Sequence, residues 1–477
     1  MKKYTFRIPE TLFEQLTSHL FPGDADEHGA VIAAGICESD REVRLLAREI
    51  FVAKDGVDYV PGKRGYRALT ADFVARISHH CAQENLCYLA VHCHGGDDCV
   101  DFSPTDVESH RRGYPALLDI TKGGPVGALV FARNAVAGSI WTVNGVFPLE
   151  SLTVIGQNIR RLYPSLQKSP IAANPLYHRQ SLMFGAAGQE ILKRTKVGII
   201  GLGGAGSLLN EWMAHLGIGE IDGIDFDKLE PSNQPRVVGS RPSDAQVFLS
   251  TMSWSALRRL GRCLAKSKVK VAERVAKSAN PTIRYHAAVD DVTRRDAALL
   301  LKDADFIFLC ADSAQARLVF NALIHQYQIP GIQVGSKVPV DKETGEIGEI
   351  FAVSRPVLPY ATGGCLLCNG LISAAKLQDE ALTEQERKRQ AYVEDELVIA
   401  PSVITLNAVA AAQAANDFLL GYFGLFTSAA RRGYTMHFCR ERHWTSVDCK
   451  ASATCLHCSS SKSILARGDR AILPCRK

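Results

Sequence analysis

An α/β chain of two domains is the fold class that the sequence predicts. With 477 residues, the chain is longer than one compact core usually is. Short strand-like runs mixed with helical stretches fill its first part and predict an α+β domain. From Lys196 onward, apolar strands alternate with amphipathic helices, which is typical of a Rossmann-like, doubly wound parallel sheet. We expect the first domain over residues 1–160, a linker over residues 161–175 and the second domain over residues 176–477.

The composition excludes several classes of protein. Hydrophobic residues make up 46% and charged residues 22% of the chain, as in ordinary globular proteins. No run approaches the roughly 20 apolar residues of a membrane span, and the start MKKYTFRIPE lacks the apolar core of a secretory signal. The net charge of +5 is small for this length, and the basic residues are spread. We therefore expect a cytoplasmic protein with no membrane and no nucleic-acid partner.

The first domain contains both kinds of element. A helix is predicted over Thr70–Gln83 from its periodicity. Strands are predicted over Ala30–Ile36, Cys87–Val91, Val126–Phe131 and Gly138–Val143. Three prolines and little periodicity mark the linker that follows.

Histidines and a carboxylate in VHCHGGDDCVDFSPTD predict a metal site. His92 and His94, two residues apart on a strand, would point to the same face and could bind one metal. Ser103 and Pro104 have the pattern of a helix start, which would aim the carboxylate of Asp106 back toward the histidines. Three protein ligands leave a fourth position for water, as in hydrolytic zinc sites.

Together with Glu27 in ADEHGAVIAAG, this pattern resembles the JAB/JAMM (MPN) zinc metalloproteases, which cleave ubiquitin-like proteins from conjugates or trim their tails. The resemblance implies that His92, His94 and Asp106 bind catalytic Zn²⁺. It also implies that Glu27 activates water and that Ser103 helps to stabilise the oxyanion. Eight residues separate His94 from Ser103, one more than is usual in the family, and a family proline after His94 is replaced by glycine.

The second domain begins with a glycine-rich turn in VGIIGLGGAGSLLNEWMAHLG. A buried strand over Val197–Ile200 and a helix over Ser207–Leu216 are predicted to flank it. The glycines allow close approach of a phosphate, and the helix start offers free N–H groups. They are Gly201, Gly203, Gly204 and Gly206. By itself this pattern leaves open whether a dinucleotide or a mononucleotide binds.

The segments after the glycine turn bear on which kind of nucleotide binds. The strand Glu220–Ile224 ends in Asp225 and Asp227, where an acidic side chain can bond ribose hydroxyls. With EPSNQPR, SKVKVAERVAKSANP and FIFLCADSAQARLVFN, the stretch from LYHRQSLMFGAAGQEIL to Gly424 resembles the ThiF/MoeB/ubiquitin-activating superfamily. That family adenylates a C-terminal carboxylate with ATP.

The resemblance implies roles for single residues and a homodimer. Asp225 would bind the ribose, Asn233 and Arg236 the phosphates, Lys268 would lie against them, Asp312 would hold Mg²⁺, and Arg179 would reach across the dimer interface. The segment Val237–Ser267 is longer than in compact members of the family, and a helix is predicted in its WSALRRLGRCL.

Two CxxC pairs predict a second metal site. Cys365, Cys368, Cys455 and Cys458 suit a closed tetrahedral zinc site of structural character. The alternative is four buried, unligated cysteines. Members of the superfamily that form a thioester keep a cysteine in the crossover region before the final helix, and residues 371–399 here contain none. The resemblance therefore implies no thioester step by this chain, and Cys439, Cys449 and Cys475 fit structural roles better.

These patterns lead to one functional hypothesis and two rivals. The hypothesis is a bacterial fusion that both activates a ubiquitin-like protein and cleaves its tail or conjugates, beside a conjugating-enzyme partner, in modification systems of which some are linked to antiphage defence. The first rival is activation and trimming of a sulfur carrier for thiamine-, molybdopterin- or cysteine-type biosynthesis. The second is a scaffold without catalytic activity that binds the modifier.

Overall fold

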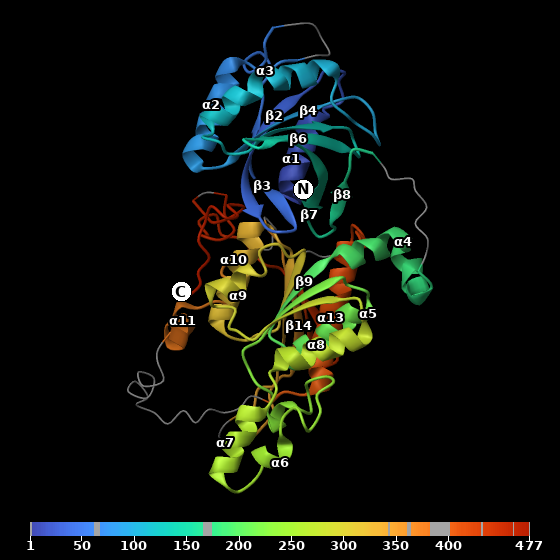
Figure 1. Ribbon diagram of the computed structural model, residues 1–477, viewed down its shortest axis with the longest axis vertical. Coiled ribbons are helices and arrows are strands. Elements are labelled where there is room, and N and C mark those ends of the chain that lie inside the picture. The colour runs from blue at the N-terminus through green and yellow to red at the C-terminus, as the bar shows by residue number, and fades with distance from the viewer. Residues whose placement is uncertain are drawn as a thin grey trace.

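The computed structural model describes residues 2–61, 67–165, 174–341, 344–359, 364–381, 401–430, 433–460 and 462–476. Two sheets lie one above the other along the long axis of the molecule (Figure 1). Among the described residues, no helix has the length and apolar character needed to cross a bilayer. Residues 166–173, which are most of the predicted linker, lie outside the described ranges. So do residues 382–399, which are most of the cysteine-free segment 371–399.

The N-terminal sheet closes on itself. Its order is β1-β3-β2-β4-β5-β6-β7-β8, and β1 also pairs with β7. The strands are β1 (Lys3–Pro9), β2 (Gly29–Glu38), β3 (Glu42–Val52), β4 (Cys87–Cys93), β5 (Val126–Phe131), β6 (Val136–Thr142), β7 (Gly145–Ile155) and β8 (Arg160–Leu162). Three helices accompany them: α1 (Glu10–Leu20), α2 (Ala71–Glu84) and α3 (Pro104–Ile120). All four predicted strands and the predicted helix are confirmed, with small shifts at their ends.

Local capping explains where two of these helices begin. The Thr70 side chain accepts a hydrogen bond from Phe73 N, so α2 begins at Ala71. At α3, Ser103 is the N-cap residue, Pro104 is in the first turn and Asp106 follows in that turn, as the sequence predicted. The structure adds that Ser103 and Asp106 form a reciprocal capping box.

The C-terminal sheet has the order β11-β10-β9-β12-β13-β14-β15-β16. The first five strands in that order are parallel and the last three are antiparallel. They are β9 (Lys196–Ile200), β10 (Glu220–Ile224), β11 (Arg284–Ala288), β12 (Phe306–Leu309), β13 (Gly331–Lys337), β14 (Phe351–Val357), β15 (Tyr434–Phe438) and β16 (His443–Val447). Strands β9, β10 and β12 are buried along their whole length, which explains their continuous apolar runs.

Helices cover both faces of this sheet. One face packs against α5 (Gly204–His215), α8 (Lys268–Ala279) and α13 (Ile404–Tyr422), and the other against α9 (Arg295–Leu299) and α10 (Ala314–Tyr327). The remaining helices are η1 (Pro175–Tyr177), α4 (His178–Arg194), η2 (Pro231–Asn233), α6 (Val247–Ser250), α7 (Ser255–Leu264) and α11 (Ala374–Ala381). Because α5 follows β9 on one face and α10 follows β12 on the other, the topological switch point lies between β9 and β12.

One expectation about the glycine turn was wrong in its bounds. The sequence predicted a helix from Ser207, but α5 begins at Gly204. Gly204 and Gly206 therefore belong to the first helical turn, because both glycines can adopt helical geometry while leaving room for close neighbours. Gly203 is the N-cap residue.

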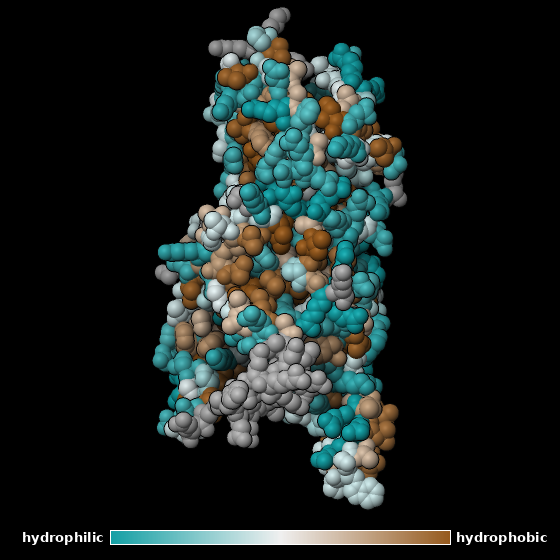
Figure 2. Space-filling view, turned by 90° about the vertical axis from the view of Figure 1, so that its left-hand side faces the viewer, coloured by the Kyte–Doolittle hydropathy of each residue, from teal (hydrophilic) through white to brown (hydrophobic). Residues whose placement is uncertain are grey.

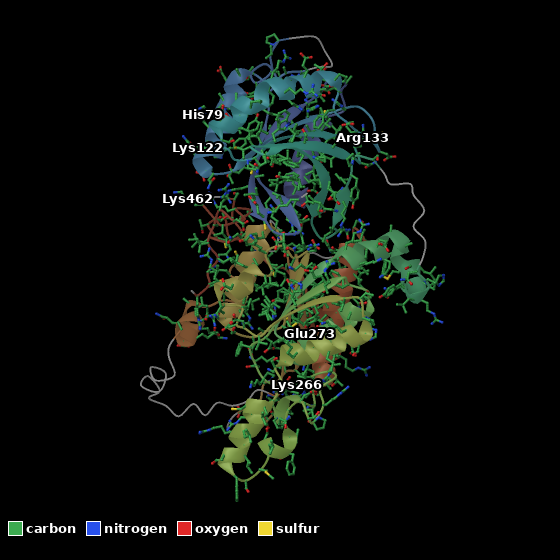
Figure 3. All side chains as sticks on the ribbon, viewed as in Figure 1. His79, Lys122, Arg133, Lys266, Glu273 and Lys462 are labelled. Carbon is green, nitrogen blue, oxygen red and sulfur yellow. The ribbon has the colours of Figure 1, made fainter. Side chains whose placement is uncertain are left out.

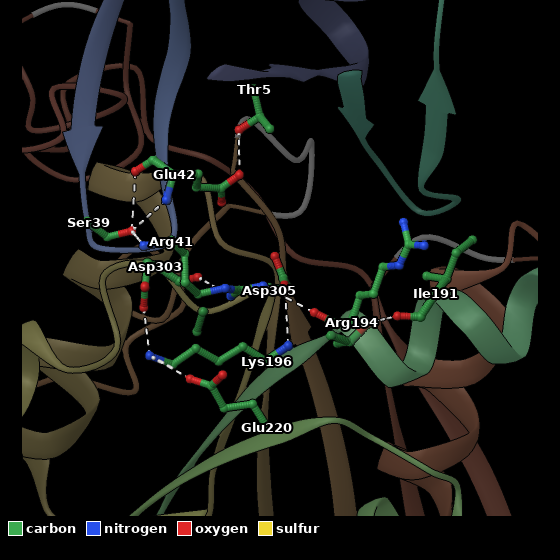
Figure 4. A network of polar contacts seen from close by, with 12 residues as sticks. Thr5, Ser39, Arg41, Glu42, Ile191, Arg194, Lys196, Glu220, Asp303 and Asp305 are labelled. Carbon is green, nitrogen blue, oxygen red and sulfur yellow. Dashed lines mark hydrogen bonds and ion pairs between the residues drawn. The ribbon is translucent and has the colours of Figure 1, made fainter. Parts of the chain in front are cut away.

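Charged groups join the two sheets at the amino ends of the parallel strands (Figure 4). The Asp305 carboxylate forms ion pairs with Arg7 at 3.0 Å, Arg41 at 3.2 Å and Arg44 at 3.4 Å. All three arginines belong to the N-terminal sheet or its turns. The backbone N–H of Lys196 donates to the same carboxylate at 3.0 Å. Burial opposes ionisation of Asp305, but the three guanidinium groups outweigh it and lower its pKa.

Residues 462–476, which we call the C-terminal strap, fill a second junction. Gly468 forms a parallel bridge with Ile36 of β2, and Asp469 N donates to Ile36 O at 2.7 Å. On the other side, Gln326 of α10 donates to Gly468 O at 2.8 Å. Leu465 and Ala466 are fully buried in the same cluster as Cys37 and Leu46 of the N-terminal sheet. The strap therefore packs between the two sheets.

Candidate functional site

The N-terminal candidate residues converge at one end of β4. His92 pairs with Gly29 of β2 and Val130 of β5. The strand ends at Cys93, and His94 follows it with its N–H donated to Phe131 O at 2.9 Å. His92 Nε2 lies 3.2 Å from His94 Nε2, and Asp106 Oδ2 lies 3.6 Å and 3.4 Å from these two nitrogens.

These separations fit a shared metal ion. Ligand atoms about 2.1 Å from a tetrahedral zinc ion lie roughly 3.4 Å from one another. One ring nitrogen from each of His92 and His94 and one Asp106 oxygen meet that condition. The ring orientation also fits, because His94 Nδ1 lies 3.1 Å from Asp101 O. A proton on Nδ1, donated to this carbonyl, leaves the Nε2 lone pair facing Asp106.

The two carboxylates at this cluster have opposite electrostatic settings. Burial raises the pKa of Asp106, but the neighbouring His92 and the Ser103 hydroxyl outweigh burial and hold that pKa well below its usual range. Burial raises the pKa of Glu27, with His92 and His94 acting against it. Glu27 Oε1 lies 3.9 Å from His94 Nε2, farther than a shared ligand would be. This position suits a proton acceptor better than a ligand.

The hydroxyl of Ser103 is committed within the chain. It donates to Asp106 Oδ2 at 2.7 Å, and the Ser103 N–H donates to the same oxygen at 2.8 Å. Ser103 therefore orients Asp106 in this state. Donating to an oxyanion would require its hydroxyl to rotate away.

Sequence reasoning missed His110 in this neighbourhood. It lies one helical turn after Asp106 on α3, with ring centroids 5.0 Å from Phe102 and 4.7 Å from Tyr114. Burial lowers the pKa of His110 to about 4, so its ring is neutral near neutral pH. The four-residue spacing from Asp106 was the available signal.

The glycine turn after β9 is shaped by close backbone contacts. A Cβ on Gly206 would lie 1.9 Å from Gly201 O, and one on Gly204 would lie 2.1 Å from Asn407 Nδ2. Gly201 has φ +86°, and its Cβ would lie 2.9 Å from Ala311 N. Gly203 differs, because a Cβ there would meet nothing within 4 Å. The open space at Gly203, beside the N-terminus of α5, can admit a phosphate.

Asp225 braces this turn. Its Oδ2 accepts from Leu202 N at 2.7 Å, and its Oδ1 accepts from Asp227 N at 2.8 Å. The side chain is buried, and burial raises its pKa. Each oxygen retains a second lone pair that a ribose hydroxyl could use. Asp227 is more exposed and pairs with Lys268 Nζ at 2.6 Å, so this lysine lies at the same edge of the sheet.

The other candidates of this site are less closely joined. Asn233 is buried and accepts from Glu230 N at 3.3 Å, and Arg236 donates to Ser232 O at 3.3 Å. Asp312 is exposed in the loop between β12 and α10. Arg179 is exposed near the start of α4. Within the described ranges, no hydrogen bond or ion pair links Arg179, Arg236 or Asp312 to the Gly203 turn.

Two further polar groups at the switch point were not foreseen. Asn407 of α13 lies against Gly204, accepts from Ser336 at 2.7 Å and donates to Ser402 at 3.1 Å. The Glu380 carboxylate accepts from Ala314 N at 2.7 Å and from Gln315 N at 2.9 Å, at the start of α10. No local pattern reveals the contact of Asn407 with Ser336 or that of Glu380 with α10, because each joins segments far apart in the sequence.

The four cysteines of the CxxC pairs form one cluster. Cys365 Sγ lies 3.6 Å from Cys368 Sγ and 3.6 Å from Cys455 Sγ, and Cys368 Sγ lies 3.5 Å from Cys458 Sγ. Thiolates about 2.3 Å from a tetrahedral zinc ion lie roughly 3.8 Å apart, so the cluster fits structural zinc. Cys439, Cys449 and Cys475 are free and partly buried.

Comparisons with known proteins bear on the second half of the chain. The ThiF family matches residues 177–457. A sulfur carrier protein adenylyltransferase of Thermus thermophilus is 27% identical over 194 residues, which are 40% of this chain and 62% of that protein. Molybdopterin-synthase adenylyltransferase of Escherichia coli is 30% identical over 159 residues, 32% of this chain and 55% of that protein. The chain thus covers less than two thirds of the length of either relative.

Among solved structures, E. coli MccB with ATP is similar to this chain. It has 22% sequence identity, a TM-score of 0.43, and coverage of 61% of this chain and 76% of that one. The ThiF match takes in the Gly203 turn, Asp225, Lys268, Asp312 and the four cysteines except Cys458. Because this match covers more than half of its residues, the chain belongs to the ThiF family.

Proposed function

We propose that this chain adenylates the C-terminal carboxylate of a ubiquitin-like protein with ATP and, at a separate zinc site, hydrolyses the tail or the isopeptide conjugates of the same protein. The observation that carries the first activity is the open Gly203 turn at the switch point of a ThiF-family sheet. The second activity rests on the convergence of His92, His94 and Asp106 beside Glu27. We further propose that the division of the chain is at residues 1–160, 161–175 and 176–477.

Adenylation needs positive charge where negative charge develops. A carboxylate oxygen of the modifier forms a bond to the α-phosphorus of ATP, and the bond to pyrophosphate breaks. Arg236 and Lys268 would stabilise the phosphate oxygens, Asn233 would bind them, and Asp312 would hold Mg²⁺. Mg²⁺ supplies charge neutralisation when bound. Lys268 must then share its ammonium between Asp227 and phosphate.

A homodimer would complete this site. Arg179 lies on α4 apart from the other candidates, and Leu182 and Met183 of the same helix are exposed. Exposed apolar side chains on a helix favour a protein contact. Arg179 would then act in the site of the other copy.

In the N-terminal domain, Glu27 would take a proton from water as it attacks the scissile carbonyl, and would pass a proton to the leaving amine. Zn²⁺ bound by His92, His94 and Asp106 supplies Lewis acidity. Ser103 would orient Asp106 and, after rotation of its hydroxyl, donate to the oxyanion. A conjugating enzyme is the expected partner that consumes the activated modifier.

A sulfur carrier is the second candidate substrate. It is favoured by the names of two relatives, the Thermus enzyme and the sulfur carrier protein ThiS adenylyltransferase of Bacillus subtilis, 30% identical over 165 residues. The neighbouring genes would distinguish the two candidate substrates. A neighbouring gene for a conjugating enzyme favours a protein modifier, and one for a cysteine desulfurase favours a sulfur carrier.

ATP:pyrophosphate exchange tests the proposal. We expect exchange only when a ubiquitin-like protein with a free C-terminal carboxylate is added, and we expect zinc in the purified protein at both predicted sites. Absence of exchange together with absence of zinc would favour the scaffold alternative.

A further inference from the structure

Two short helices project from the molecule beside the nucleotide site. Helices α6 and α7 form a hairpin, residues 247–264, at the lower end of the chain in Figure 1 and as a separate projection in Figure 2. Gly261 holds the hairpin together, because a Cβ there would lie 2.7 Å from Ser250 Oγ and 2.8 Å from Ser250 N. The two helices therefore form a unit rather than a loose loop.

Large apolar side chains on this hairpin face solvent. Phe248 is 75% exposed, Trp254 73%, Leu264 55% and Leu260 47%. These four side chains fall within the short segment 247–264, and we call them the hairpin cluster; single exposed apolar residues spread over a surface are ordinary. Tryptophan and phenylalanine are also among the residues that anchor protein interfaces. The cluster therefore favours a protein contact.

The same hairpin carries an uncompensated positive charge. Arg258, Arg259 and Arg262 lie on α7, and among the described residues none of them has an ion-pair partner. Among the described residues, the acidic groups at the foot of the hairpin already have partners: the Asp244 side chain is 1% exposed and paired with Lys266 and Arg274, and Asp227 is paired with Lys268. Lys266 is labelled beside α8 in Figure 3. The surface thus suits a partner with acidic side chains around an apolar patch.

The hairpin is anchored to the candidate nucleotide site. The segment that contains it, residues 237–267, lies in the sequence between Arg236 and Lys268, two candidate residues of that site. At its base, Leu229 N donates to Lys266 O at 2.8 Å, and Lys268 N donates to Asp227 O at 2.9 Å. A protein bound to the hairpin would therefore lie next to the Asp227–Lys268 pair.

We propose that the α6–α7 hairpin is the docking surface for the folded body of the ubiquitin-like protein whose tail is adenylated. The inference rests on the proposed function and assigns the partner an acidic surface with an apolar centre. A second copy of this chain fits less well. A two-fold contact through the hairpin would set the same three arginines of both copies against each other without described acidic partners.

The test measures ATP:pyrophosphate exchange with a ubiquitin-like protein from the same genome that ends in Gly-Gly. We compare the wild type with Trp254→Ala and with the double variant Arg258→Glu/Arg259→Glu. The KM for the modifier should rise about tenfold or more in each, as for interface anchors. The KM for ATP and the kcat should stay near wild type, because all three side chains are exposed and, within the described ranges, none forms a hydrogen bond or ion pair with the candidate nucleotide residues.

Matched controls remove an exposed apolar group or reverse an exposed charge elsewhere. They are Val143→Ala and Lys122→Glu, both in the N-terminal domain, and Lys122 is labelled in Figure 3. Both controls should keep the wild-type KM for the modifier. Thermal unfolding of all four variants should match the wild type, since every substituted side chain is exposed.

Three outcomes would overturn the inference. An unchanged KM for the modifier in both hairpin variants overturns docking alone and leaves the proposed function standing. A wild type without modifier-dependent exchange overturns the proposed function and the docking together. Sedimentation velocity that shows a wild-type dimer and monomeric hairpin variants assigns the hairpin to self-association instead.

Discussion

A Cβ atom on Gly35 would stand 1.9 Å from the carbonyl oxygen of Ala466. Gly35 lies in β2 of the N-terminal sheet, and Ala466 lies in the C-terminal strap. The converse contact also exists, because a Cβ on Gly468 would stand 2.0 Å from Ile36 O. Backbone meets backbone here, so neither side can yield by turning a side chain.

Gly35→Ala should therefore displace the strap. We expect a loss of about 1–3 kcal/mol in the free energy of unfolding, as for other overpacked sites. Hydrogen exchange should accelerate at Glu38 N, which now donates to Asp469 at 2.8 Å. Gly113→Ala is the control, since Gly113 is exposed on α3 with nothing within 4 Å of its Cβ position. Equal stability of the two variants would contradict the packing described for the strap.

Asp305→Asn should be strongly destabilising near neutral pH. It removes the carboxylate that faces three guanidinium groups, and an unpaired buried charge costs about 3–5 kcal/mol. Glu150→Gln, which breaks the exposed pair of Lys3 and Glu150, should cost at most about 1 kcal/mol. Urea unfolding measures both.

The pH dependence of Asp305→Asn has a definite sign. The pKa of Asp305 is lowered in the folded protein, so its stabilising contribution is complete above the ordinary value of 3.8. It disappears as the pH falls through the folded pKa. The difference between wild type and variant should be constant from about pH 8 to pH 5 and shrink only below pH 4. A difference that shrank already between pH 7 and pH 5 would exclude this carboxylate as its source.

Two glycines of the nucleotide turn should respond differently to alanine. Gly206→Ala forces a Cβ onto Gly201 O and should lower the melting temperature. Gly203→Ala meets nothing within 4 Å among the described residues, so it should keep the melting temperature and weaken ATP binding. Isothermal titration with a non-hydrolysable ATP analogue checks the second statement. If Gly203→Ala bound the ATP analogue as tightly as the wild type, the proposal that a phosphate binds at this turn would be wrong.

Loss of zinc from the four-cysteine cluster should loosen the packing of the C-terminal strap. The strap is joined to the second CxxC pair, because Ile464 N donates to Leu456 O at 3.0 Å, and it is joined to α10, because Ala466 N donates to His325 O at 2.8 Å. Cys365→Ser should remove one zinc per chain by metal analysis and accelerate hydrogen exchange in residues 462–476. Cys439→Ser is the matched control and should change neither. If hydrogen exchange in the strap did not change in the zinc-free variant, the cysteine cluster would not stabilise the strap.

The sequence was most informative where pattern and structure are local. Alternation and buried runs located the strands, and the pattern from Ser103 to Asp106 predicted where α3 begins. The closed N-terminal sheet could not be foreseen, because β1 pairs with β7 across more than a hundred residues. Asn407, Glu380 and the strap share this property, since their contacts depend on packing between distant segments. The sequence predicts α5 only from Ser207, because glycine is typical of turns, whereas Gly204 and Gly206 lie in its first helical turn.

If one chain holds two independent reaction centres, intact-mass spectrometry of the modifier after incubation with ATP should reveal the product of each. The wild type should give both an AMP adduct and a shortened or released tail. Asp312→Ala should lose the adduct by about a hundredfold or more and keep cleavage, and Glu27→Gln should lose cleavage and keep the adduct. Loss of both products in either variant, with the fold intact, would contradict two separate centres.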